Sequence, residues 1–258
     1  MRRQQRLSCS SSTILTTCSD RSVVAALPRA AYATAVETLA GSVVRALTGG
    51  DDAFRLADQL TTSESGTAGL AAVRVLGSDV LAPFVLGGHR FSDKDGEIVA
   101  ASIHTFPLSE PAQDTTPVRA LRDWATGQVL TRLGVAGFAP PYPAHGHISR
   151  KQGWVTWTGT LGRLAPLAFP GLDCPVHADA RRHRLDLARG VTRAVLRRDY
   201  LTAARLARWL AAVSGDAPLV PPFPVEPVLR QLELVADPDT RLILEIILAR
   251  HHTETPQQ

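Results

Sequence analysis

The stretch Phe91-Ser-Asp-Lys-Asp-Gly-Glu-Ile-Val99 carries a strong turn signal near the middle of the chain, the dipeptide Asp95-Gly96. Asp-Gly between two runs of strand-forming residues favours the tight turn of a β-hairpin. The residues from Glu97 to Phe106 are therefore predicted to form a strand that pairs with the strand before the turn. This hairpin is the starting point for the expected fold.

Short runs of β-branched and bulky residues lie on both sides of this turn, and runs of about four to eight such residues are typical of strands. They are Val73-Arg-Val-Leu76, Val80-Leu-Ala-Pro-Phe-Val-Leu86 and Trp154-Val-Thr-Trp-Thr-Gly-Thr-Leu161. A helix is expected to start near Thr116-Pro117, because Thr suits the cap and Pro the first helical position. Together these elements predict a small antiparallel sheet of about four strands with one helix across it.

Both ends of the chain have the periodicity of helices rather than strands. Near the start, Val36, Leu39 and Val43 recur at spacings of three and four, which is typical of an amphipathic helix. Near the end, Asp199 can cap a helix over residues 200–213. The expected fold class is therefore α+β, with a disordered tail at 1–21, an α+β domain at 22–172 and a helical subdomain at 173–258.

The composition excludes several classes of protein. The chain has 258 residues, of which 45% are hydrophobic and 20% charged, and no uninterrupted apolar run approaches the roughly 20 residues of a membrane span. Three cysteines, Cys9, Cys18 and Cys174, have no metal-binding spacing and form no disulfide framework. We expect a soluble cytoplasmic protein without a membrane partner. The basic, Ser-rich residues 1–21 leave a targeting peptide open as the alternative to a tail.

Arginine dominates the basic residues, since only Lys94 and Lys151 are lysines among 28 basic side chains. Together with abundant Ala, Leu, Val, Gly and Pro, this bias indicates a bacterial protein from a GC-rich genome. Motifs for phosphate loops, dinucleotide binding, nucleophilic serine and paired-cysteine zinc sites are absent from the sequence. No cofactor is therefore expected.

Histidines supply the weak candidates for an enzyme. His145-Gly-His147 places two imidazoles on one side of an extended segment, where they can share a zinc or iron ion, and a solvated loop is the alternative. His89 follows Gly87-Gly88, which permits close approach of a ligand, and His104 lies within the expected strand. These two are candidate acid/base catalysts, with a structural role as the alternative.

A concentration of positive charge is the other functional signal. Residues 181–210 contain nine arginines and two aspartates, a net charge of +7, although the whole chain carries only +4. Within this segment Arg182, Arg189, Arg193 and Arg197 are spaced seven, four and four apart, which places them on one helix face. Such a face can bind phosphates or an acidic protein, and a merely solvated face is the alternative.

Two functions from different classes remain open on the sequence. The first is a non-catalytic accessory or regulatory protein that binds an acidic or anionic partner, most simply a protein, through this Arg-rich hairpin. Nucleic acid is a possible partner without support from any motif. The second is a small-molecule enzyme with its site near the 87–89 and 145–147 loops. The first hypothesis requires exposed arginines, and the second requires histidines that converge on a pocket.

Overall fold

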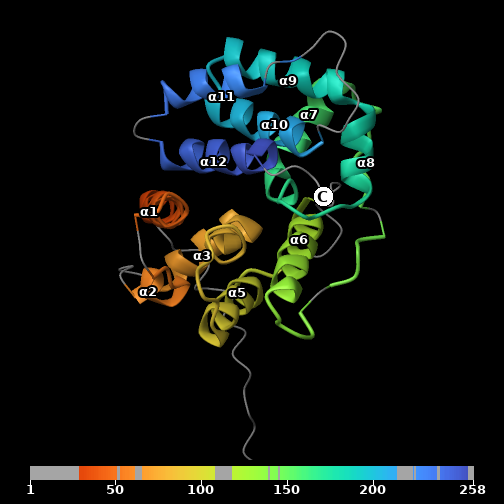
Figure 1. Ribbon diagram of the computed structural model, residues 1–258. Helices are drawn as coiled ribbons and strands as arrows, with labels where there is room; N and C mark the ends of the chain where they lie inside the picture. The colour runs from red at the N-terminus through yellow and green to blue at the C-terminus, as the bar shows by residue number, and fades with distance from the viewer. Residues whose placement is uncertain are drawn as a thin grey trace, which may run out of the picture.

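The structure, a computed structural model, is built from helices throughout the part that it describes (Figure 1). The described residues are 29–50, 53–61, 66–107, 118–138, 140–144, 146–213, 223, 225–236 and 239–254. The expected tail at 1–21, its alternative targeting peptide and the expected helix start at Thr116-Pro117 lie outside these ranges. No β-strand occurs within them, so the predicted α+β fold with an antiparallel sheet is wrong.

The elements follow one another in chain order. They are α1 (Arg29–Leu47), α2 (Leu56–Thr61), α3 (Gly66–Leu76), the 3-10 helix η2 (Gly77–Leu81), α4 (Ala82–Val85), α5 (Asp93–Thr105), α6 (Val118–Arg132), α7 (Trp154–Arg163), the 3-10 helix η3 (Ala165–Leu167), α8 (Pro175–Arg182), α9 (Arg184–Leu196), α10 (Tyr200–Ala212), α11 (Val225–Glu233) and α12 (Thr240–Glu254).

The expected hairpin at Asp95-Gly96 is instead the first turn of α5. Ser92 precedes the helix, and both its hydroxyl and its backbone N–H donate to the Asp95 carboxylate, at 2.6 and 3.0 Å. The other oxygen of Asp95 accepts the backbone N–H of Leu56 at 2.8 Å, so the carboxylate also holds the start of α2. Asp95 is fully buried, which a hairpin turn would not require. The acid caps helices rather than turning a hairpin.

The expected strand at 154–161 is helix α7, although it is rich in β-branched residues. Its threonines donate their hydroxyls to carbonyls one turn earlier: Thr158 to Trp154 at 2.9 Å and Thr160 to Thr156 at 3.1 Å. These bonds satisfy the hydroxyls inside the helix, where Thr is otherwise disfavoured. Trp157 is fully buried, and its indole N–H donates to the Asp179 carboxylate at 3.0 Å.

The other two expected strands belong to α3, η2 and α4. The stretch Gly66–Val85 is long and apolar enough to cross a membrane by length and composition, and it alone qualifies among the described residues. However, 78% of the apolar 18-residue window within it is buried in the protein, against α1, α5 and α6 among others. A short apolar run that is buried on several sides has no period that separates a strand from a helix, and this accounts for the wrong assignment.

The helices form two packed groups that share α12 (Figure 1). Helix α12 contacts α1 on one side and α10 on the other. Its residues Leu244 and Leu248 enter the apolar cluster of α1, α3 and α4, whereas Leu242 and Ile246 enter the cluster of α6, α7, α9 and α10. Residues two apart lie on opposite sides of a helix, so α12 is apolar on both faces and joins the two clusters.

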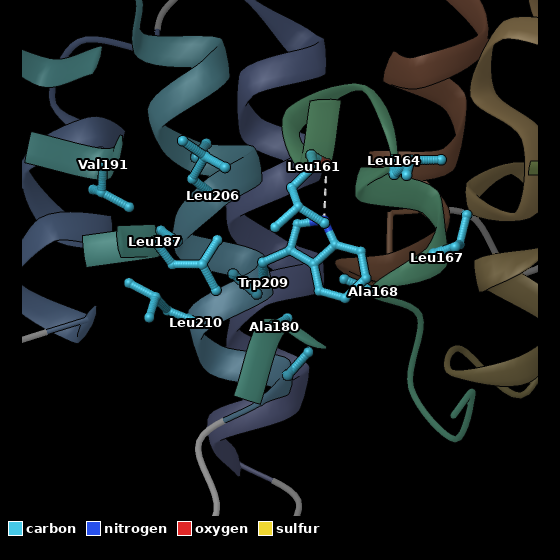
Figure 2. Packing of buried hydrophobic residues seen from close by; sticks show 14 of the residues in the cluster. Leu161, Leu164, Leu167, Ala168, Ala180, Leu187, Val191, Leu206, Trp209 and Leu210 are labelled. Atoms are coloured by element: carbon cyan, nitrogen blue, oxygen red, sulfur yellow. Dashed lines mark hydrogen bonds between the residues drawn. The ribbon is translucent and has the colours of Figure 1, made fainter. Parts of the chain in front are cut away.

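Trp209 on α10 lies at the middle of the second cluster (Figure 2). Its side chain is fully buried, and its indole N–H donates to the carbonyl of Leu161 at 2.9 Å. Leucines from α7, α9 and α10 surround the ring. This packing fixes α9 across α7 and α10, so that the opposite side of α9 faces outward.

Candidate functional site

The four arginines predicted to bind a partner lie on the outer side of α8 and α9. Arg182 ends α8, and Arg189, Arg193 and Arg197 follow on α9 and its C-terminal end. The side chains of Arg182 and Arg189 are 71% and 55% exposed, and Arg193 and Arg197 are exposed as well. None of the four points into the core. Helix α8 ends at Arg182 and α9 begins at Arg184, so the four arginines extend over two helices and not along one.

Two of these arginines are held by acids on their own helix. Arg189 donates to Asp186 at 3.0 Å, and Arg182 lies 4.0 Å from Asp179. Both pairs are exposed on the arginine side, so their contribution to stability is small. By contrast, the guanidinium groups of Arg193 and Arg197 have no hydrogen bond or ion pair with any described residue. Their charges are the ones free to meet a partner.

The distant acids Glu226 and Glu233 do not neutralise this face. Glu226 pairs with Arg230 at 3.1 Å and lies 3.7 Å from Arg250, and Glu233 pairs with Arg250 at 2.8 Å. The exposed Arg250 pair lowers the pKa of Glu233 below its usual value. Both acids therefore tie α11 to α12 and leave α9 alone.

Exposed leucines accompany the arginines on α9. Leu185 is 42% exposed and Leu196 is 80% exposed. Leu185, Arg189 and Leu196 are spaced four and seven apart, so they share one stripe of the helix. We call the side chains of Arg182, Leu185, Arg189, Arg193, Leu196 and Arg197 the outer face. It offers both positive charge and apolar surface.

Two arginines of the same basic segment point inward, which the sequence did not predict. Arg208 is fully buried, where it donates to both oxygens of Asp79 at 3.0 and 2.7 Å and to Glu245 at 3.0 Å. Its Nε–H donates to the carbonyl of Ala168 at 2.7 Å. Arg205 donates to the other oxygen of Glu245 at 2.9 Å. The net charge of the segment is therefore divided between the surface and the interior.

The two buried acids of this network differ in acidity. Burial would raise the pKa of Glu245, but Arg208 and Arg205 outweigh burial and hold it below its usual value. Burial raises the pKa of Asp79, and the negative charge of Glu245 raises it further, although Arg208 acts in the opposite direction. A signal for this network exists in the sequence, since Glu245 interrupts the apolar run from Leu242 to Ala249.

His89, a predicted acid/base candidate, has a structural role. Its Nδ1 accepts the backbone N–H of Phe54 at 3.2 Å, which requires the proton to be on Nε2. Nε2 in turn lies 3.1 Å from the carbonyl oxygen of Ala46 and donates to it. Because both ring nitrogens are engaged, the imidazole joins the end of α1 to the segment before α2, and it has no nitrogen left for a substrate.

The remaining predicted histidines do not come together. His104 is exposed in the last turn of α5, and His147 is exposed in the segment before α7. His145 lies outside the described residues. Among the residues that the structure does describe, no group of three or more His, Cys, Asp or Glu side chains is placed to hold a metal ion.

A cysteine–histidine pair lies at the start of α8 and was not predicted. Its spacing of three residues, in Cys174-Pro-Val-His177, is visible in the sequence. The Sγ of Cys174 lies 3.2 Å from Nδ1 of His177. Burial raises the pKa of the Cys174 thiol and lowers the pKa of His177 to about 4. Both groups are thus neutral near pH 7, whereas a nucleophilic cysteine needs a thiolate beside an imidazolium. The pair packs against Trp209 as part of the core.

The chain matches no protein-family model, no curated protein and no solved structure. The chemistry of its own side chains is therefore the basis for a functional proposal.

Proposed function

We propose that the protein is a non-catalytic binding protein whose outer face on α8 and α9 engages an acidic segment of another protein. The observation that carries the proposal is the pair Arg193 and Arg197, two exposed guanidinium groups without a partner among the described residues, beside the exposed Leu196. Arginine with apolar neighbours is the composition typical of protein interfaces.

The leucines favour a protein over a nucleic acid. A phosphate backbone would use the arginines alone, and nucleic-acid binding surfaces add stacking aromatics or a helix that enters a groove. The outer face has no aromatic side chain, and Leu196 is 80% exposed between charged residues. An acidic, amphipathic helix would cover the leucines while its carboxylates meet the arginines.

The proposal is tested with a fluorescein-labelled synthetic helix that carries Glu on one side and Leu on the other. Its affinity is measured by fluorescence anisotropy with the wild-type chain and with Arg193→Glu/Arg197→Glu. Reversal of two partly desolvated contacts, each worth about 1–3 kcal/mol, should raise Kd by at least tenfold, about 1.4 kcal/mol. Affinity should also decrease with salt.

The matched control is Arg55→Glu/Arg90→Glu. Both arginines are exposed, and they lie next to α2 and before α5, on the far side of the molecule from α9 (Figure 1). This variant has the same net charge as the test variant and should bind like the wild type. A Leu196→Ser variant should have lower affinity for the Glu/Leu peptide. Its affinity for a second peptide, in which Ser replaces Leu, should be the same as that of the wild type. An equal loss of peptide affinity in the test and control variants would contradict the proposal. Tighter binding of a DNA duplex than of the peptide would also contradict it.

A further inference from the structure

A pocket of about 190 Å³ lies where the two helical groups meet, away from the outer face. Its walls come from α3, η2, α6, α7, η3, α10 and α12. Four arginines line it: Arg122 from α6, Arg163 from the end of α7, Arg205 from α10 and Arg241 from α12. Arginines that are so far apart in the sequence converge here only because the chain folds.

The acids of the pocket do not balance these arginines. Asp79 and Glu245 line it, but Arg208 lies behind them and takes both oxygens of Asp79 and one of Glu245. Arg205 takes the remaining oxygen of Glu245. Every carboxylate oxygen in the wall is thus already bonded to a guanidinium.

Three guanidinium groups therefore remain without an acid. Arg122 donates to the carbonyl of Val75, and the guanidinium groups of Arg163 and Arg241 have no hydrogen bond or ion pair with a described residue. Arg122 and Arg241 are both partly buried, whereas Arg163 is exposed. Positive charge that is removed from water without a counter-charge costs free energy, which an anion in the pocket would recover.

The lowered pKa of the Arg122 guanidinium group is consistent with this excess of positive charge. Burial, together with the repulsion of Arg205 and Arg74, lowers its pKa to about 10, even though Asp79 acts in the opposite direction. An anion beside Arg122 would reverse this effect, because a nearby negative charge favours the protonated guanidinium.

We propose that this pocket binds a small phosphate monoester. Guanidinium groups bond phosphate oxygens in pairs, and a phosphate presents its terminal oxygens in diverging directions, as required by arginines from α6, α7 and α12. The volume suits a ligand of a few carbon atoms. Leu76, Leu244 and Pro166 supply an apolar wall for that carbon part.

The test compares phosphate binding in the wild-type chain and in Arg163→Gln/Arg241→Gln. Isothermal titration calorimetry is run with glycerol 3-phosphate, inorganic phosphate and succinate at equal ionic strength. The control, Arg55→Gln/Arg90→Gln, removes the same charge from two exposed arginines that belong neither to the pocket nor to the outer face. We expect one site per chain for glycerol 3-phosphate, a Kd raised by at least about tenfold in the pocket variant, and no change in the control.

Melting temperature provides a second, independent readout. Without a phosphate compound, the pocket variant should melt at or above the wild-type temperature, because it removes uncompensated positive charge. With glycerol 3-phosphate, the wild type should melt at the higher temperature, because only the wild type gains stability from the ligand. A pocket variant that melts well below the wild type without ligand would show that these arginines are structural.

Three results would overturn the proposal: no heat of binding for either phosphate compound up to about 10 mM, unchanged affinity in the pocket variant, or tighter binding of succinate than of glycerol 3-phosphate. The outcome is independent of the outer face. Loss of peptide binding in Arg193→Glu/Arg197→Glu tests that surface alone, and its failure leaves the pocket result as it stands.

Discussion

Arg208 lies fully buried between two carboxylates from distant parts of the chain, Asp79 and Glu245. A buried ion pair adds little net stability, because the loss of hydration offsets the attraction. Removal of one partner is different, since the remaining charges are left in the interior without compensation. The network therefore determines how η2, α10 and α12 meet.

Arg208→Met should destabilise the protein by about 3–5 kcal/mol, because two buried carboxylates lose their shared guanidinium. The free energy of unfolding is measured by urea denaturation. Arg193→Met, which replaces an exposed arginine, should change it by less than about 0.5 kcal/mol. If Arg208→Met lowers the free energy of unfolding by less than about 1 kcal/mol, Arg208 does not bond both Asp79 and Glu245 in solution.

The buried His177 makes the protein sensitive to acid. Burial lowers its pKa from 6.5 to about 4, so between these pH values the unfolded chain binds a proton that the folded chain does not. The free energy of unfolding therefore decreases as pH falls through this range, by about 3 kcal/mol for this one group. His252, lowered to about 4 by burial, acts in the same direction.

We expect His177→Leu to reduce the loss of stability between pH 6.5 and 4. Urea denaturation at several pH values measures this slope. His147→Leu is the control, because His147 is exposed and its replacement should leave the slope as in the wild type. If both variants keep the wild-type slope, His177 titrates in the folded protein and is not shielded from protons.

At the scale of the elements, α9 can lie close to α7 and α10 because Gly190 has no side chain. A Cβ at this position would meet Leu206 and Thr158 at 3.0 Å. Gly159 on α7 is also helical, but a Cβ there would meet nothing within 4 Å. The two glycines thus separate the effect of packing from the effect of helix propensity.

Gly190→Ala should lower the free energy of unfolding by about 1–3 kcal/mol, because the overpacked interface outweighs the gain in helix propensity. Gly159→Ala should raise it by up to about 1 kcal/mol. Thermal denaturation measures both variants. Stabilisation by Gly190→Ala would mean that α9 is packed less closely than the structure shows, and the placement of the outer face would need revision.

The sequence predicted the helices that have one apolar face and failed on elements that are buried on several sides. Asp199 was predicted to cap the helix after it, and its carboxylate accepts the N–H of Thr202 at 3.2 Å. The segment 73–86 is covered on several sides by other helices, so its apolar residues have no helical period. At Asp95-Gly96 the spacing of Ser92 to Asp95 is that of a capping box, a helix-start signal that the predicted hairpin did not take into account.

The sequence likewise predicted only part of the candidate site. The spacing of Arg189, Arg193 and Arg197 predicted a shared helix face, and the structure shows these side chains exposed. Spacing alone did not separate them from Arg205 and Arg208, which lie in the same basic segment but point inward. Contacts with Asp79 and Glu245 are long-range and become visible only in the folded chain.

At the scale of the whole molecule, α12 belongs to both apolar clusters, which should therefore unfold together. Leu244 is packed with α1 and α3, and Ile246 is packed with α10. Leu244→Ala and Ile246→Ala should each cost about 2–5 kcal/mol and lower the midpoint of one shared transition. Calorimetry that resolves two transitions, with each variant lowering only one of them, would show that the clusters are independent.

Positive charge gathers at two places in the described part of the molecule: the outer face on α8 and α9, which we propose binds an acidic protein segment, and the pocket between the helical groups. Hydrogen-exchange mass spectrometry of the full chain with the Glu/Leu peptide tests the first place most directly. We predict slower exchange in residues 182–198 and no change in the segments that line the pocket. Slower exchange at the pocket, or none in residues 182–198 at saturating peptide, would contradict this prediction.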